Sequence, residues 1–193
     1  MVHILPHWTW EDRIGEITPV HVFTSGDEVE LFLNGKSLGR KKKGSYEYRL
    51  RWDSIKYAPG ILKAVAYKKG KKWAEQSIQT AGNPTILKAS ADRYNLSSDN
   101  DLSFITVSVL DAKGNTVPGA ANLIEFSIEG PGEIVATDNG DPADLVAFNS
   151  TKRSAFSGFA LAIIRSKKGE KGAIKVIVTS AGIKTDTITL MRK

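Results

Sequence analysis

Short runs in which polar and apolar residues alternate are the feature that most constrains what this chain can fold into. In the run YEYRLRW (46–52), the two tyrosines, Leu50 and Trp52 alternate with charged side chains. A period of two sends successive side chains to opposite faces of an extended segment, so the run is predicted to be a half-buried strand. No window of twelve residues has a convincing helical period. The sequence therefore predicts an all-β protein.

Comparable runs recur along the whole chain and are separated by glycine, asparagine and proline turn signals. In the first part they span residues 19–25, 28–35, 61–70 and 74–82. In the second part they span residues 85–93, 101–111, 123–130, 132–140, 157–166, 172–182 and 185–192. Several short strands joined by regular turns are typical of an immunoglobulin-like sandwich. We therefore predict two tandem immunoglobulin-like β-sandwich domains.

The boundary between these domains is predicted within TAGNPT (80–85). This stretch contains Gly82 and Pro84 and has no large apolar side chain to anchor it, as expected of a linker. We assign residues 1–82 to the first domain and residues 83–193 to the second. The chain has no cysteine, but domains of this size bury enough surface to fold without disulfides or metals.

Positive charge is concentrated at glycine-bounded stretches of the first domain. The net charge is +6 at pH 7, and GRKKKG (39–44) and YKKGKKW (67–73) are predicted to be solvated hairpin tips whose lysines keep a sheet edge unpaired. Asn34-Gly35 predicts a type I′ hairpin turn. Since the lysines gather at turns and not on one face beside aromatic residues, nucleic acid is not an expected partner.

The sequence offers no catalytic constellation. Its acidic residues lie mostly at predicted turns, and it contains neither a phosphate-binding loop nor a G-x-S-x-G elbow. With no cysteine beside them, the histidines His3, His7 and His21 do not predict a metal site, and we expect no cofactor. The segment TDNGDP (137–142) resembles a calcium loop in composition but lacks the closing glutamate of an EF-hand, so we expect a turn.

Four aromatic or histidine side chains are the candidate site residues: His7, Trp8, Trp10 and Trp73. Trp8 and Trp10 lie two apart, so on an extended segment they would point the same way. Beside His7, this pair would stack on a sugar ring or dock on another domain if it is exposed. Packing in the core or between domains is the alternative, and we favour it.

Residues 4–44 carry a resemblance to a known family. The order Pro-His-Trp-x-Trp, a valine-rich strand and VELFLNGKSLG (29–39) resembles the immunoglobulin-like domain that follows the catalytic barrel in bacterial glycoside hydrolase family 2 enzymes of the β-galactosidase type. YAPGILKAVAYKKGK (57–71) resembles the end of that domain. Residues 104–142 and 153–166 resemble the family's last, invasin-like domain.

The resemblance implies an accessory role. In this family the catalytic glutamates lie on an upstream (β/α)₈ barrel, whereas this sequence has no alternation of strands and helices, so we expect the chain alone to be inactive. The resemblance implies that the chain braces that barrel, its expected partner, and that His7, Trp8 and Trp10 shape the rim of the substrate cleft. A carbohydrate-binding module that takes an oligosaccharide, or an adhesin-type module, is the alternative.

Two expectations concern the setting of the chain. Strand-like residues directly after Met1 suggest a segment of a longer protein, and the resemblance implies export to the periplasm or cell surface. No apolar run reaches the length of a membrane span, so we expect no membrane insertion.

Overall fold

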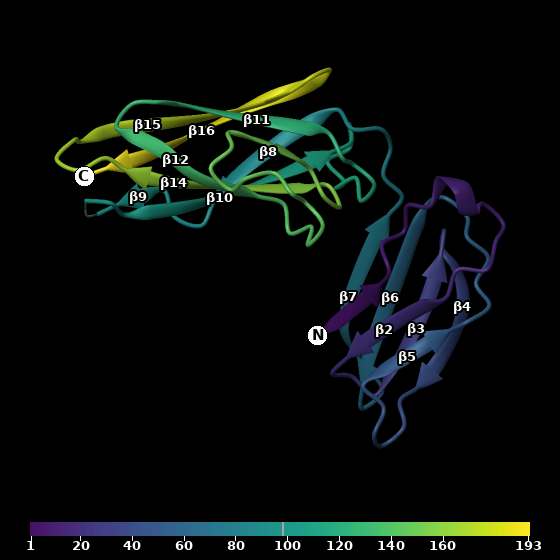
Figure 1. Ribbon diagram of the computed structural model, residues 1–193. Coiled ribbons are helices and arrows are strands. Elements are labelled where there is room, and N and C mark those ends of the chain that lie inside the picture. The colour runs from purple at the N-terminus through teal and green to yellow at the C-terminus, as the bar shows by residue number, and fades with distance from the viewer. Residues whose placement is uncertain (98) are drawn as a thin grey trace. The chain divides into compact units, whose positions relative to one another are not determined.

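The computed structural model describes residues 1–97 and 99–193 and divides the chain into two compact units, Met1–Thr80 and Ala81–Lys193 (Figure 1). Among the described residues, the one helix is the 3-10 turn η1 (Glu11–Arg13), and the other regular elements are strands. The predicted all-β, immunoglobulin-like fold is confirmed. No helix in these residues is long or apolar enough to cross a membrane.

Unit 1 consists of two antiparallel sheets. The first has the order β1-β2-β5 and is formed by Val2–Leu5, Val20–Thr24 and Arg49–Trp52. The second has the order β4-β3-β6-β7 and is formed by Lys36–Lys42, Glu28–Leu33, Ile61–Lys68 and Lys71–Gln79. Alternation places Val20, Val22 and Leu50 of one sheet in the same buried cluster as Leu31 and Leu62 of the other.

Two sequence predictions for unit 1 are wrong. The strand predicted at 46–52 begins only at Arg49, and Tyr46 and Tyr48 are 100% and 65% exposed. Gly44 and Glu47 form a turn there, since the amide of Glu47 donates to the carbonyl of Gly44. This turn takes the tyrosines out of the sheet.

The stretch predicted as a hairpin tip at 39–44 lies largely within β4, where Arg40 pairs with Glu30 and Lys42 with Glu28. β4 is an edge strand, so lysines at this position disfavour pairing with another chain. The other two turn predictions for unit 1 hold. The stretch 67–73 contains the turn between β6 and β7 at Lys69 and Gly70, whose φ values are 51° and 75°. Asn34 and Gly35 have φ of 51° and 80°, as a type I′ turn requires.

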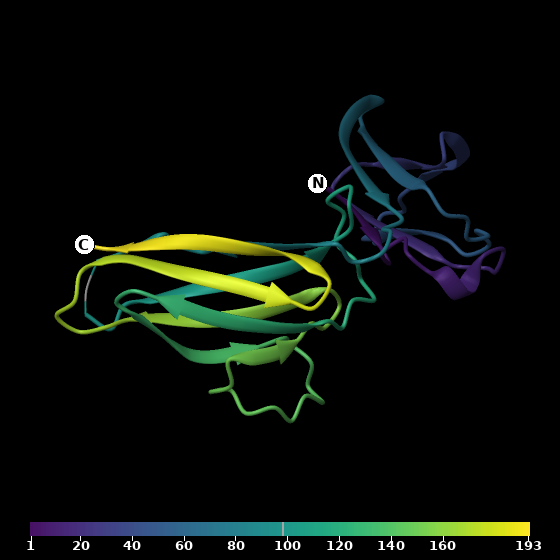
Figure 2. The same cartoon turned by 90° about the horizontal axis from the view of Figure 1, so that it is seen from above.

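In the part of unit 2 that the structure describes, nine strands lie in two layers (Figure 2). One layer has the order β12-β14-β10-β8 and is formed by Gly132–Asp138, Phe159–Ser166, Leu102–Leu110 and Ile86–Ala91. The other has the order β16-β15-β11-β13 and is formed by Ile183–Arg192, Gly172–Ser180, Leu123–Glu129 and Lys152–Ser154. The short strand β9 (Asn95–Leu96) pairs with β16.

A single buried cluster fills the space between the layers of unit 2. It includes Ile105 and Ile164 from one layer and Val176 and Leu190 from the other, all 0% exposed. Ala81, at the start of the unit, is also part of it. All seven strands predicted in this region are present. The sequence missed β9 and β13, which have two and three residues.

Candidate functional site

Trp8 anchors the segment that follows β1. Its side chain is 1% exposed, and the ring packs edge-on against Tyr57 with centroids 5.0 Å apart. The indole Nε1 donates a hydrogen bond to the carbonyl of Ala58 at 3.0 Å. Trp8 therefore belongs to the core of unit 1 and does not present its ring to a ligand.

The backbone around Trp8 is also fixed. The hydroxyl of Thr80 donates to the carbonyl of Trp8 at 2.7 Å, and the amide of Trp10 donates to the hydroxyl of Tyr57 at 3.2 Å. These contacts join residues more than forty positions apart in the sequence. Because of them, residues 7–10 have a defined position on the end of unit 1.

His7 and Trp10 form a stacked pair, which we call the His7–Trp10 ledge. Their ring centroids are 4.2 Å apart with an interplanar angle of 24°, and Trp10 Nε1 donates to the carbonyl of His7 at 3.0 Å. Partial burial lowers the pKa of His7 from 6.5, so the imidazole is neutral at pH 7. The two rings of the ledge therefore carry no charge of their own, but the guanidinium of Arg13 lies over the Trp10 ring, 5.7 Å from its centroid.

Trp73 lies apart from this group. It is 52% exposed, and its Nε1 donates to Ser25 Oγ at 3.0 Å. Trp73 stands near the start of β7, whereas Thr80, which contacts Trp8, follows the end of that strand. At a strand rise of 3.3 Å per residue these two positions are about 23 Å apart. The structure brings together His7, Trp8 and Trp10, but not Trp73.

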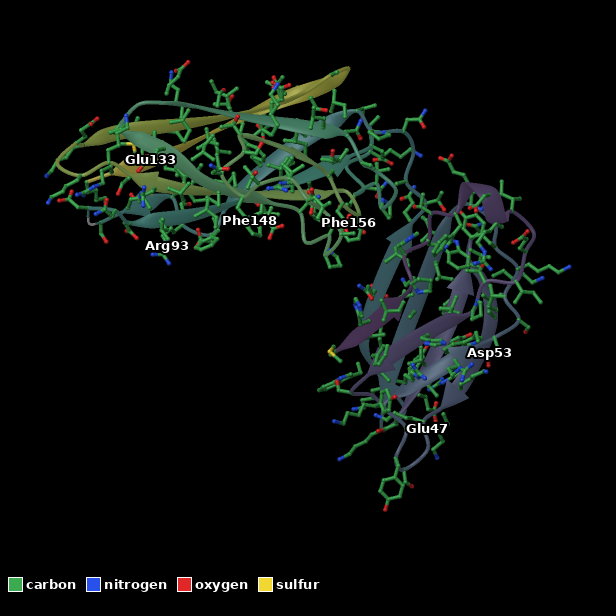
Figure 3. The ribbon with its side chains drawn as sticks, viewed as in Figure 1. Glu47, Asp53, Arg93, Glu133, Phe148 and Phe156 are labelled. Atoms are coloured by element: carbon green, nitrogen blue, oxygen red, sulfur yellow. The ribbon has the colours of Figure 1, made fainter. Side chains whose placement is uncertain are left out.

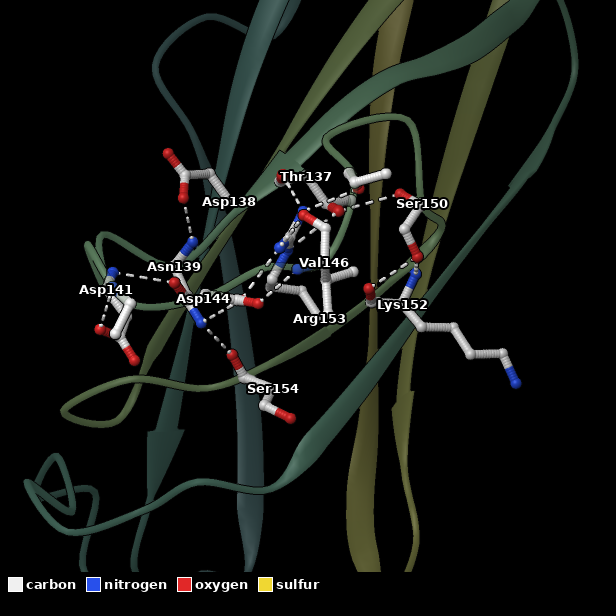
Figure 4. Close-up of polar contacts among 12 residues, drawn as sticks. Thr137, Asp138, Asn139, Asp141, Asp144, Val146, Ser150, Lys152, Arg153 and Ser154 are labelled. Atoms are coloured by element: carbon white, nitrogen blue, oxygen red, sulfur yellow. Dashed lines mark hydrogen bonds and ion pairs between the residues drawn. The ribbon is translucent and has the colours of Figure 1, made fainter.

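A second site, which the sequence did not single out, is the loop 139–151 between β12 and β13 (Figure 4). Its first half is a series of turns in which a carboxylate or amide oxygen accepts a nearby amide. Asp138 accepts from Asn139, Asp141 from Ala143 and Asp144 from Val146. No group of three or more metal-ligating side chains occurs among the residues the structure describes.

The side chain of Arg153 in β13 lies inside this loop and donates hydrogen bonds to it. It is 1% exposed. Nη1 donates to Asp144 Oδ2 and to the carbonyl of Val146, both at 2.9 Å. Nη2 donates to the carbonyls of Thr137 at 2.7 Å and Ala147 at 3.0 Å. Nε donates to the hydroxyl of Thr137 at 3.3 Å. All five guanidinium contacts therefore join β13 to β12 and to the loop.

Charge is balanced within this network. The backbone amide of Val146 and the guanidinium of Arg153 hold the pKa of Asp144 below its usual range, so the carboxylate stays ionised next to the buried cation. Asn139 Nδ2 also donates to Asp144 Oδ2 at 2.8 Å and to the carbonyl of Ser154 at 3.0 Å. The network can therefore hold the loop in place.

The loop carries three large exposed apolar side chains, which we call the apolar tip: Leu145 is 97% exposed, Val146 47% and Phe148 66%. Phe148 is labelled in Figure 3. In the sequence, the only indication of the apolar tip is a short apolar run within a polar loop. Arg153 gave no signal because its acceptors are mainly backbone carbonyls.

Comparisons with known proteins identify the family of the chain. Residues 87–189 match the model of the glycoside hydrolase family 2 C-terminal domain 5, and residues 15–74 match a domain of unknown function, DUF4982. The chain belongs to glycoside hydrolase family 2 and corresponds to a C-terminal accessory region of its enzymes. The resemblance found in the sequence is confirmed.

Individual relatives support this assignment. The chain is 41% identical over 95% of its length to the β-galactosidase BoGH2A of Bacteroides ovatus, of which it covers 21%. It is 36% identical over 94% of its length to a putative β-glucuronidase of Formosa agariphila, of which it covers 18%. A crystal structure of a glycosyl hydrolase family 2 member from Bacteroides cellulosilyticus matches 98% of the chain with a TM-score of 0.93 and 34% identity, and the match covers 24% of that protein. The chain thus spans about a fifth of the length of these curated relatives.

Proposed function

We propose that this accessory region braces the catalytic barrel of a longer glycoside hydrolase family 2 enzyme and shapes the rim of its substrate cleft. The His7–Trp10 ledge is the observation that carries the proposal. It is a stacked aromatic pair fixed to a core by Trp8. A partly exposed aromatic surface held in one position suits contact with another domain, because little conformational freedom is lost on docking.

The chemistry of the whole enzyme is proposed from its relatives. Those named above are called a β-galactosidase and a putative β-glucuronidase, so we propose that the full-length enzyme hydrolyses β-galactosides or related glycans and that the catalytic glutamates lie outside this chain. Export to the periplasm or cell surface belongs to the same proposal and follows only from the resemblance. Fractionation of the producing cells would test it.

The test of bracing uses the full-length enzyme with the double substitution His7→Ala and Trp10→Ala. We expect a lower melting temperature and a raised KM, because the ledge contacts the barrel at the cleft rim. Trp73→Ala is the matched control, since it also removes a half-exposed indole from unit 1. Unchanged melting temperature and kinetics in the double variant would refute the proposal.

A carbohydrate-binding module is the competing function. Such a module needs several aromatic rings on one face, but Trp10 and Trp73 lie toward opposite ends of β7 and Trp8 is buried. This placement favours bracing. Affinity electrophoresis of the 193-residue chain in gels that contain galactan separates the two functions. Retardation that Trp10→Ala abolishes would support the binding module instead.

A further inference from the structure

The apolar tip of the loop 139–151 gathers three large exposed apolar side chains on one short segment. Leu145, Val146 and Phe148 lie within four consecutive positions, and each is at least 47% exposed. Figure 2 shows the loop projecting away from the strands of unit 2. Single exposed apolar residues are common, whereas several large ones on one short projecting loop are a candidate interaction site.

The tip is held in a defined conformation. On one side of it, Arg153 and the Val146 amide hold Asp144. On the other side, the carbonyl of Phe148 accepts the amide of Thr137 at 2.7 Å. The hydroxyl of Thr137 donates to the carbonyl of Ser150 at 2.9 Å. A loop tied at both sides of its tip loses little conformational entropy when the tip is buried by a partner.

We propose that the apolar tip docks against the catalytic part of the same full-length chain. The inference rests on the proposed function, because it requires this chain to belong to a longer enzyme. The curated relatives extend far beyond the matched region, which covers 21% of the Bacteroides ovatus enzyme. Most of the surface available to the tip would therefore belong to the rest of that chain.

The size of the tip favours the same chain over a second copy. Three side chains of this kind offer on the order of 400 Å² of apolar surface, whereas stable interfaces between separate proteins bury about 1,200 Å² or more. A covalently linked partner is present at an effective concentration of about a millimolar, so a small contact suffices within one chain.

Photo-cross-linking tests the inference directly. The probe p-benzoyl-phenylalanine is placed at position 148 of the full-length enzyme, and at position 123 in the control, because Leu123 is an apolar residue of the same unit that is 50% exposed. We expect position 148 to form cross-links within one chain to peptides of the catalytic part, and position 123 to form few. Cross-links between two chains, or none at position 148, would overturn the inference.

A second pair of variants separates this inference from the bracing proposal. Leu145→Ser with Phe148→Ser is expected to lower the melting temperature of the full-length enzyme by about 2–4 °C, whereas Leu123→Ser leaves it unchanged. If the tip variant has no effect while His7→Ala with Trp10→Ala still does, docking of the tip is refuted and bracing stands. If neither has an effect, both are refuted.

Discussion

Residues 6–10 of unit 1 and the loop 139–151 of unit 2 are both irregular segments. Each is held in place by its own large buried side chain, or anchor, and the two anchors differ in chemistry. Trp8 is held by burial against Tyr57 and by one hydrogen bond from its indole nitrogen. Arg153 is equally buried and makes five hydrogen bonds.

The difference determines what each anchor tolerates. An apolar anchor depends mainly on volume and area, so a similar ring retains most of its contribution. A buried guanidinium depends on its full set of acceptors, which lose their partner together when it is replaced. All four tryptophans, Trp8, Trp10, Trp52 and Trp73, lie in unit 1. Tryptophan fluorescence therefore reports the unfolding of unit 1, and circular dichroism reports both units.

The largest expected effect is that of Arg153→Met. The substitution leaves the Asp144 carboxylate and three carbonyls without their donor, and loss of one partner of a buried ion pair costs about 3–5 kcal/mol. In urea unfolding of the 193-residue chain, the part of the dichroism change that comes from unit 2 should move to lower urea while the fluorescence transition stays. Arg165→Met is the control, since the Arg165–Glu133 pair is exposed. An unshifted dichroism transition for Arg153→Met would break the comparison.

Asp111→Asn tests whether polar anchoring is general in unit 2. Asp111 is 3% exposed and accepts hydrogen bonds from the amides of Gly82, Lys113 and Asn115. In asparagine an NH2 group replaces one carboxylate oxygen and cannot accept hydrogen bonds from these amides. We therefore expect the free energy of unfolding of unit 2 to fall by about 1.5–3 kcal/mol. Asp141→Asn, which retains an oxygen for its single contact with Ala143, should have little effect. A shift of equal size in the control would contradict this account.

Trp8→Phe should have a smaller effect, confined to unit 1. Phenylalanine keeps an aromatic ring in the core but leaves the carbonyl of Ala58 without its donor, so we expect a loss of about 1–2 kcal/mol. The fluorescence of the remaining tryptophans gives the measurement. A loss as large as that of Arg153→Met would remove the distinction between the two anchors.

The stability of the two units should depend on pH in different ways. The change in unit 1 is the smallest of the expected effects. Burial lowers the pKa of His7, so the unfolded chain binds that proton more readily and unit 1 loses stability as the pH falls below 6.5. Burial raises the pKa of Asp111, but hydrogen bonds led by that from Gly82 bring it to about 2. Its contribution is complete above pH 3.8 and is lost as the pH falls toward 2.

Thermal unfolding between pH 3 and 8 measures this contrast. The fluorescence transition should begin to weaken near pH 6.5. His7→Ala should remove the His7 share of this dependence, while His21, whose pKa is also lowered by burial and by Arg49 and Arg51, retains the rest. The part of the dichroism change that does not follow the fluorescence transition reports unit 2, and it should weaken only under more acidic conditions. A unit 2 transition that weakens between pH 6.5 and 5 would contradict the assignment.

The strands could be predicted from the sequence because burial on one face imposes a period of two, as in Val20 and Val22. Asn34-Gly35 could also be predicted, because its turn needs positive φ at both residues. Tyr46 and Tyr48 could not, because a local turn between Gly44 and Glu47 outweighs the alternation that continues through them.

The candidate site was predictable only in part. The sequence indicated the cluster of His7, Trp8 and Trp10, but the segment bends and does not stay extended, so the two tryptophans have different environments. Arg153 could not be identified, because its acceptors are residues of β12 and of the loop that come together only in the folded unit. The exposure of Phe148 likewise depends on how that loop is held.

Hydroxyl-radical footprinting of the full-length enzyme, normalised to the urea-unfolded enzyme, tests the central claim that this region faces the catalytic part through its two anchored segments. Trp10, Leu145 and Phe148 should be strongly protected, while Tyr46, which is 100% exposed in this chain, should react almost as in the unfolded enzyme. Reactivity of Leu145 and Phe148 equal to that of Tyr46 would contradict the account.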